Sequence, residues 1–227
     1  MLRIFRGKEE AEKAIGNTII VDIVCATTVM TYFLHKGAES IIPASQIEDV
    51  IQLKKNNPDF LVAGDYAHEY RELFDVDIFS EESFRAFDPS GKNVIYISYN
   101  GTRRIIESIN STRHYLGSFL NLSALIEEVR KNPSQYCFLL AMSESFGGDE
   151  DEAFADYFNL MLKGEPGEIS EYLLKVTTSN VVRNGSMIFN APYLVEMAVD
   201  HDLTDIVPFS LYDEELGMMV IRAGIRN

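Results

Sequence analysis

The sequence lacks long apolar runs, closely spaced cysteines and clusters of basic residues. Its longest apolar stretches, such as Thr18–Val24 and Tyr136–Met142, are far shorter than the roughly 20 residues of a membrane-spanning helix. The N-terminal segment has no apolar signal core, so we expect a cytoplasmic protein that contacts no membrane. Cys25 and Cys137 form no C-x-x-C motif. We therefore expect two buried free thiols, not a redox motif or a zinc site.

Positive charge is also scarce. The chain has 35 acidic residues against 20 Lys and Arg, for a formal net charge of -15. This balance excludes a nucleic-acid backbone as partner, because phosphate neutralisation requires clustered Lys and Arg. Most of the acids, including those between residues 184 and 221, are expected on a solvated surface. The alternative for some of them is that they hold a divalent cation, which would let an acidic protein bind an anionic substrate.

Strand-like and helix-like segments alternate from residue 17 to about 175. This pattern predicts an α/β layered fold with a mostly parallel central sheet flanked by helices, in one domain spanning 1–227. Strands are expected at Asn17–Val24, Ser40–Pro43, Phe60–Gly64, Asn93–Tyr99, Tyr115–Leu120 and Tyr136–Met142. Helices are expected at Thr28–Lys36, Ser45–Asn56, Thr102–Asn110, Ser123–Lys131, Ala153–Lys163 and Ile169–Val176.

Two further segments and one capping motif complete this prediction. The segment from about residue 65 to 92 is predicted to be a long polar loop, and such loops are often functional. Ser45 with Glu48 three residues later forms a capping-box pattern that would open its helix. Residues of about 177–227 read as a C-terminal extension, with a polar stretch at Asn180–Ser186, a helix near Tyr193–Asp200 and a closing strand at Gly217–Arg222.

Ligands in open α/β sheets bind beyond the carboxyl ends of the strands, so we expect the functional residues at the strand ends. Asp22 lies in a β-branched run, where a carboxylate is costly to bury unless it is paired or metal-bound. The hydroxyls of Thr27 and Thr28 follow at a helix start. The alternative is that Asp22 is a capping residue satisfied by backbone N–H groups.

A second candidate lies after the strand Asn93–Tyr99. The Asn100-Gly101 pair allows a turn whose successive N–H groups bind an anion at a helix start, with Thr102 and Arg103 as further donors. An ordinary strand-to-helix turn with a threonine cap explains the pattern equally well. Only the arginines that follow favour the anion-binding interpretation.

Acidic residues at other strand ends suggest a metal. Glu150 and Asp151 precede a predicted helix, where they either complement the helix dipole or join Asp22 around Mg²⁺. Asp65 ends a third strand. Carboxylates at three strand ends and anion donors at a fourth are what a metal-dependent phosphomonoesterase requires.

Together these motifs resemble the 2-phosphosulfolactate phosphatase (ComB) family, Mg²⁺-dependent enzymes of coenzyme M biosynthesis with an α/β fold. The first matching positions are Asp22, Ala26, Thr27 and Thr28 in D-x-x-R-A-T-T, then Gly37-Ala38, Gly64-Asp65, Phe74-Asp75 and Ser98 through Arg103. The later ones are Gly117, Ser118, Asn121 and Ala124, then Glu150, Asp151 and Ala155, then Asp205 through Pro208. The order is conserved from about residue 17 to 208, so the combination is more specific than any single motif.

The resemblance implies a set of roles. The substrate would be a small anionic phosphoester or sulfonate, and the cofactor Mg²⁺. The sequence leaves the oligomeric state open, with a homodimer as one alternative. Whether Asp22 or water is the nucleophile stays open. The expected catalytic residues are Asp22, Asn100 and Arg103; the substrate-binding residues Thr27, Thr28, Gly101, Thr102 and Asn121; and the metal ligands Asp22, Asp65, Glu150 and Asp151.

The chain also departs from the family pattern. Cys25 stands where the family has arginine, and Ile78 where it has asparagine. Three hypotheses follow. The first is a phosphatase of this type, and the second is a catalytically impaired relative that binds a small anion or a protein partner. The third is an enzyme with a shifted substrate, in which Tyr66 and Tyr99 line a less charged pocket.

Overall fold

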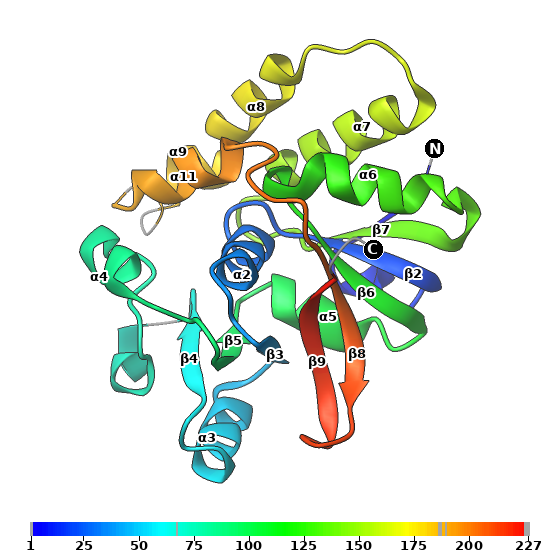
Figure 1. Cartoon of the computed structure of the whole chain (residues 1–227). Helices are drawn as coiled ribbons and strands as arrows, with labels where there is room; N and C mark the ends of the chain where they lie inside the picture. Colours follow the sequence, from blue (N-terminus) through cyan, green and yellow to red (C-terminus); the bar gives the residue numbers. More distant parts are fainter. Residues whose placement is uncertain (1, 67, 186–187, 189, 225–227) are drawn as a thin grey trace.

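A computed structural model describes residues 2–66, 68–185, 188 and 190–224 of the chain (Figure 1). Within these ranges one sheet contains nine strands, in the order β1-β7-β2-β6-β8-β9-β3-β5-β4. The strands are β1 Arg3–Arg6, β2 Gly16–Val21, β3 Ser40–Ala44, β4 Leu61–Gly64, β5 Asn93–Ile97, β6 Ser111–Gly117, β7 Tyr136–Leu140, β8 Val207–Asp213 and β9 Met218–Gly224.

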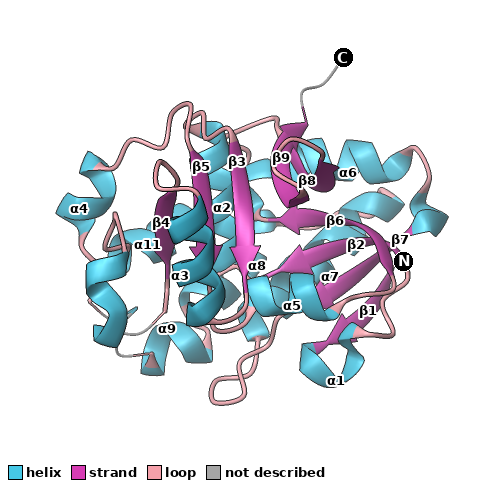
Figure 2. Ribbon diagram, turned by 90° about the horizontal axis from the view of Figure 1, so that it is seen from below, coloured by secondary structure: helices cyan, strands magenta, loops and turns pink. Residues whose placement is uncertain are grey.

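The sheet consists of two parallel blocks. Strands β1, β7, β2 and β6 form one, and β3, β5 and β4 form the other. The antiparallel hairpin β8–β9 joins them and pairs antiparallel with both β6 and β3. The predicted mostly parallel sheet is therefore confirmed, with a mixed centre. Figure 2 shows that the strands of the two blocks point toward a common region near the middle of the molecule.

Helices cover both faces of this sheet (Figure 2). Helices α1, α3 and α5 lie on one face, and α2, α6 and α7 lie on the other. The α-helices are α1 Gly7–Ala11, α2 Ala26–His35, α3 Ile47–Asn56, α4 Glu81–Ala86, α5 Gly101–Glu107, α6 Leu122–Arg130, α7 Asp149–Lys163, α8 Ile169–Thr177, α9 Asn180–Asn184 and α11 Pro192–Val199. Three 3₁₀ helices are η1 His68–Leu73, η2 Phe119–Asn121 and η3 Pro133–Gln135.

Side-chain alternation along the strands builds a core on each face. In β3, Ile41 joins the large cluster that contains Phe33 of α2, whereas its neighbour Ile42 joins a smaller cluster with Val50 of α3. Successive strand side chains point to opposite faces, so a strand covered on both faces must be apolar at every position. The same reasoning explains the continuous apolar run at the end of β2.

The structure corrects the predicted loop and extension. The 65–92 segment contains η1 and α4, so it is not a long loop without elements. Residues 177–227 are not simply an extension, because they supply the central hairpin β8–β9. The polar stretch from Asn180 forms α9 up to Asn184, and Ser186 lies outside the described residues. Strand β1 and helix α1 were not predicted, since both are short and half polar.

Several element boundaries also differ from the predictions. Helix α3 begins at Ile47, and Asp49, not Glu48, completes its capping box by accepting from the Gln46 amide at 3.2 Å. Helix α7 begins at Asp149 instead of Ala153, so the acidic stretch is the first turn of the helix itself. Strand β6 ends at Gly117, because Ser118 caps η2 there. Polar cap residues set the boundaries at α3 and at the end of β6, whereas α7 begins after Gly148, which provides no side-chain cap.

Both cysteines are free and buried, as the sequence predicted. None of the helices in the described ranges is long and apolar enough to cross a bilayer.

Candidate active site

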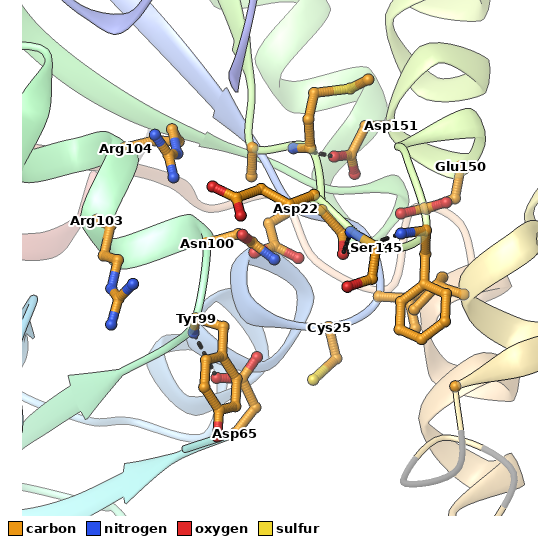
Figure 3. Close-up of a pocket in the computed structure, with 18 of the residues that line it drawn as sticks. Asp22, Cys25, Asp65, Tyr99, Asn100, Arg103, Arg104, Ser145, Glu150 and Asp151 are labelled. Carbon is orange, nitrogen blue, oxygen red and sulfur yellow. Dashed lines mark hydrogen bonds between the residues drawn. The ribbon is translucent and has the colours of Figure 1, made fainter. Parts of the chain in front are cut away.

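One cavity of about 430 Å³ lies at the carboxyl ends of four strands (Figure 3). The loop after β2 contributes Asp22 and Cys25, and the end of β4 contributes Asp65. The loop after β5 contributes Asn100, and the segment after β7 contributes 141–146. The parallel blocks therefore deliver polar groups from distant parts of the sequence to one place.

Asp22 lies at the centre of this arrangement in Figure 3. Its side chain is buried and accepts hydrogen bonds from the backbone N–H groups of Ala26 and Gly101. Thr27 fixes the loop, because its hydroxyl donates to Gly117 O at 2.7 Å and accepts from the Asp22 amide at 3.1 Å. Burial raises the pKa of Asp22 to about 6, although the two N–H donors oppose this shift.

Gly101 is required for the close approach of α5 to this carboxylate. A Cβ atom at Gly101 would lie 2.7 Å from Asp22 Oδ2 and 2.8 Å from Ala26 Cβ. The turn before α5 is held by a reciprocal pair, in which the Thr102 amide donates to Ser98 Oγ at 2.8 Å and the Ser98 amide donates to Thr102 Oγ1 at 2.9 Å. Asn100, the N-cap position of α5, is left facing the cavity.

Three basic residues line the cavity within the described ranges: Lys8, Arg103 and Arg104. Arg103 donates from Nε to Ser45 O at 3.2 Å, and its guanidinium lies over the Tyr66 ring. Arg104 is buried and paired with Glu107 at 2.5 Å, yet its Nε has no hydrogen-bond partner. A buried guanidinium with an unused donor is suited to an anionic ligand.

Acidic residues line the same cavity as these basic residues. Asp151 Oδ1 accepts from the Ile23 amide at 2.8 Å, and Asp65 Oδ1 accepts from the Tyr99 amide at 3.1 Å. Glu150 Oε2 is buried without a partner. Burial, followed by the negative charge of Asp22, raises the pKa of both Asp65 and Glu150 to about 8. The pKa of Asp151 is also raised, first by burial and then by Glu150.

This excess of negative charge bears on the predicted metal. In the part of the chain that the structure describes, no three His, Cys, Asp or Glu side chains gather closely enough to hold a metal ion. However, carboxylates that raise one another's pKa, with one orphaned oxygen on Glu150, form a hard-oxygen environment that a divalent cation would neutralise. The donor set therefore fits Mg²⁺ in chemistry, although the side chains are not assembled around a common point.

The structure divides the sequence-predicted site residues into two groups. Asp22, Asp65, Asn100, Arg103, Glu150 and Asp151 line the cavity together. Thr27, Thr28, Gly101, Thr102 and Asn121 are buried and do not line it.

The polar atoms of the second group have partners inside the fold. Thr28 donates to Ile23 O at 2.8 Å, and Asn121 bridges the Ser118 amide and Leu116 O, each at 3.2 Å. These buried residues stabilise the loops that carry the cavity-lining residues. Their role as substrate-binding residues stays a prediction.

The sequence assigned no role to Arg104, although it counted both arginines in favour of anion binding, and it missed Lys8. Arg104 follows the motif residue Arg103 directly, so its position offered a signal. Lys8 offered none, because helix α1 was not predicted and its approach to α5 is a tertiary contact.

Apolar side chains and one thiol also line the cavity, from Val24, Cys25, Phe79 and Val181. Cys25 therefore faces the cavity. Ile78 does not, because it packs in the core with its carbonyl accepting from the Tyr193 hydroxyl. The rings of Tyr66 and Tyr99 stack with centroids 4.7 Å apart, and only Tyr99 of this pair lines the cavity.

Comparison with known proteins identifies the family of the chain. A model of the family described as 2-phosphosulpholactate phosphatase matches residues 5–192. The chain belongs to this family. The predicted resemblance is thus confirmed, and so is the assignment to a family of phosphoric monoester hydrolases.

Relatives named "Probable 2-phosphosulfolactate phosphatase" extend the match. The protein from Thermoplasma acidophilum is 32% identical over 185 residues, covering 81% of each chain. The protein from Thermoplasma volcanium is 27% identical over 211 residues, covering 92% of this chain and 95% of its own. One from Bacillus subtilis is 23% identical over 163 residues, covering 72% of this chain and 71% of its own.

Proposed function

We propose that the cavity hydrolyses a small anionic phosphomonoester in a Mg²⁺-dependent reaction of the 2-phosphosulfolactate phosphatase type. One observation carries this proposal. The buried Asp22 carboxylate, the Asn100 amide and two arginines of α5 line one cavity with Asp65, Glu150 and Asp151, in a chain that belongs to this family.

Each of the cavity residues has a separate role in this reaction. Asn100 and the α5 arginines bind the phosphoryl oxygens, and the guanidinium of Arg104 offsets the charge that develops in the transition state. Arg103 orients the group from the rim, where Ser45 and Tyr66 hold it. The nucleophile is the Asp22 carboxylate or a water molecule that Asp22 orients. Thr27 and Thr28 keep the Asp22 loop in place through bonds to Gly117 O and Ile23 O.

Asp22, Glu150 and Asp151 would hold the metal, with Asp65 at the edge of the set. When bound, Mg²⁺ supplies Lewis-acid polarisation of the phosphoryl group. Without a cation, the negative charge of Asp22 acts on the carboxyls of Asp65, Glu150 and Asp151, and such repulsion is costly in a buried site.

Phosphate release from 2-phosphosulfolactate and a panel of small phosphomonoesters tests the proposal, measured with Mg²⁺ and with a chelator. We expect turnover of at least one member that stops on chelation and returns with added Mg²⁺. Absence of phosphate release from the whole panel would reject the catalytic proposal.

The second candidate is a protein that binds a small anion or a protein partner without turnover. It is favoured by Cys25 at the family arginine position and by the engagement of Arg103 with Ser45 and Tyr66. Titration calorimetry with Mg²⁺ and then with inorganic phosphate distinguishes the two. Binding of both without release of phosphate from any ester supports this second candidate.

A further inference from the structure

The basic residues of the cavity lie at one end of it. Among the described lining residues, the cations are Lys8 of α1 and Arg103 and Arg104 of α5, two helices in contact with each other. In Figure 3 the two arginines lie on one side of Asn100 and Cys25 lies on the other.

The part of the cavity that contains Cys25 offers an anion no cation, because Lys8, Arg103 and Arg104 are the Lys and Arg side chains among the described lining residues. Apolar side chains of the lining include Val24 and Cys25 of the loop after β2, Phe79 before α4 and Val181 of α9, and the hydroxyls of Ser143 and Ser145 also line the cavity. Cys25 is 1% exposed, and the charged groups that act on its thiol are the carboxylates of Asp65 and Asp22. A second anionic group placed here would lose its hydration and meet negative charge.

We propose that this end receives the organic part of the substrate, that this part is uncharged and partly apolar where it contacts Cys25, and that Cys25 determines this preference. The inference rests on the proposed function and refines it. The substrate class is a phosphomonoester without a sulfonate at the Cys25 end.

Two compounds test this directly, because 2-phospholactate and 2-phosphosulfolactate differ only by a sulfonate on the methyl carbon. We expect wild-type kcat/KM to be at least about tenfold higher for 2-phospholactate, since a sulfonate buried without a cation loses its hydration. Cys25→Arg should reverse the preference by supplying a cation. Cys25→Ser, matched in size and uncharged, should keep it.

Cys25 is buried, so its arginine variant is paired with a second one. Val181 is half-buried on α9 and lines the same cavity, and Val181→Arg places a cation there from the rim. We expect it to lower the preference for 2-phospholactate as well. Equal or faster wild-type turnover of 2-phosphosulfolactate would overturn the inference, as would an unchanged preference in both arginine variants.

A binding measurement separates this inference from the proposed function. Calorimetry in the presence of Mg²⁺ compares lactate with 3-sulfolactate, and the inference expects tighter binding of lactate. If lactate binds more tightly while no ester is hydrolysed, only the proposed function fails. If 3-sulfolactate binds more tightly, the inference fails whether or not turnover occurs. If neither ligand binds and no ester is hydrolysed, both fail.

Discussion

Gly101 and Asp22 approach so closely that a Cβ atom on the glycine would lie 2.7 Å from Asp22 Oδ2. The Gly101 N–H also donates to this carboxylate. The first turn of α5, which carries the arginines, is thus fixed against the loop that carries the central carboxylate.

We predict that Gly101→Ala damages the site more than the fold. The added methyl group must displace Asp22 or α5, an overpacking cost of about 1–3 kcal/mol in unfolding free energy. A displacement of this kind should lower kcat by about a hundredfold. The matched control is Ile106→Ala on the exposed side of α5. Equal kcat in the two variants would show that the close contact does not matter for activity.

The metal prediction concerns Glu150. We expect Mg²⁺ to raise the thermal midpoint of the wild type, because a ligand that binds only the folded state stabilises it. Glu150→Gln removes a buried carboxylate whose Oε2 has no partner, and should abolish most of this shift. Glu152→Gln, two residues along α7 and paired with Arg6, is the control and should retain it. A full Mg²⁺ shift in the Glu150→Gln variant would remove Glu150 from the ligand set.

Arg104 should matter for transition-state stabilisation. Lysine in its place keeps the charge but loses the planar fork of donors, so Arg104→Lys should lower kcat/KM for a phosphomonoester by about ten- to a hundredfold. Arg85→Lys is the control, since Arg85 is exposed and pairs with Glu81. The role assigned to Arg104 is wrong if the two variants have the same kcat/KM.

His114 links α5 to the sheet and should make stability depend on pH. Its Nε2 lies 3.0 Å from Ser108 Oγ, whose hydroxyl donates to Arg104 O, and its Nδ1 lies 3.2 Å from Ser210 Oγ. Burial lowers the pKa of His114 below its usual 6.5. The unfolded chain therefore binds the proton first, and the stabilisation by His114 is complete above pH 6.5 and is lost as pH falls toward the folded pKa.

Denaturant unfolding of the wild type and of His114→Gln between pH 5 and 8 measures this effect. The difference in unfolding free energy should shrink or reverse as pH falls below about 6.5. Because the variant retains all other titrating groups, their contributions cancel in the difference. A difference independent of pH would mean that His114 keeps an ordinary pKa in the fold.

The sequence predicted most of the fold because the buried strands are continuous apolar runs. It failed where an element depends on a distant partner. Strand β1 is the short, half-polar segment R-I-F-R, which is extended because it pairs with β7. Strand β8 contains Pro208, a residue that disfavours a strand prediction. Neither carries a strong local signal.

The site was predicted in part for a similar reason. Motif spacing identified Asp22, Asn100 and Asp151 at strand ends, but it could not tell which hydroxyls face the cavity. Thr27 and Thr102 look like ligand donors in sequence, yet the Thr27 hydroxyl bonds to the Asp22 amide and to Gly117 O, and the Thr102 hydroxyl accepts from the Ser98 amide. Only packing decides between these two uses, and packing likewise brings Lys8 and Arg104 to the cavity.

The most direct test of the central claim is the rate of phosphate release from 2-phospholactate with Mg²⁺, compared between the wild type and Asp22→Asn. Asp156→Asn, at an exposed position of α7, serves as the control for an Asp-to-Asn change. We predict that Asp22→Asn lowers kcat by about a thousandfold or more while the thermal midpoint in the absence of Mg²⁺ stays close to that of the wild type. An Asp22→Asn variant as active as the Asp156→Asn control would contradict the assignment of this cavity as the catalytic site.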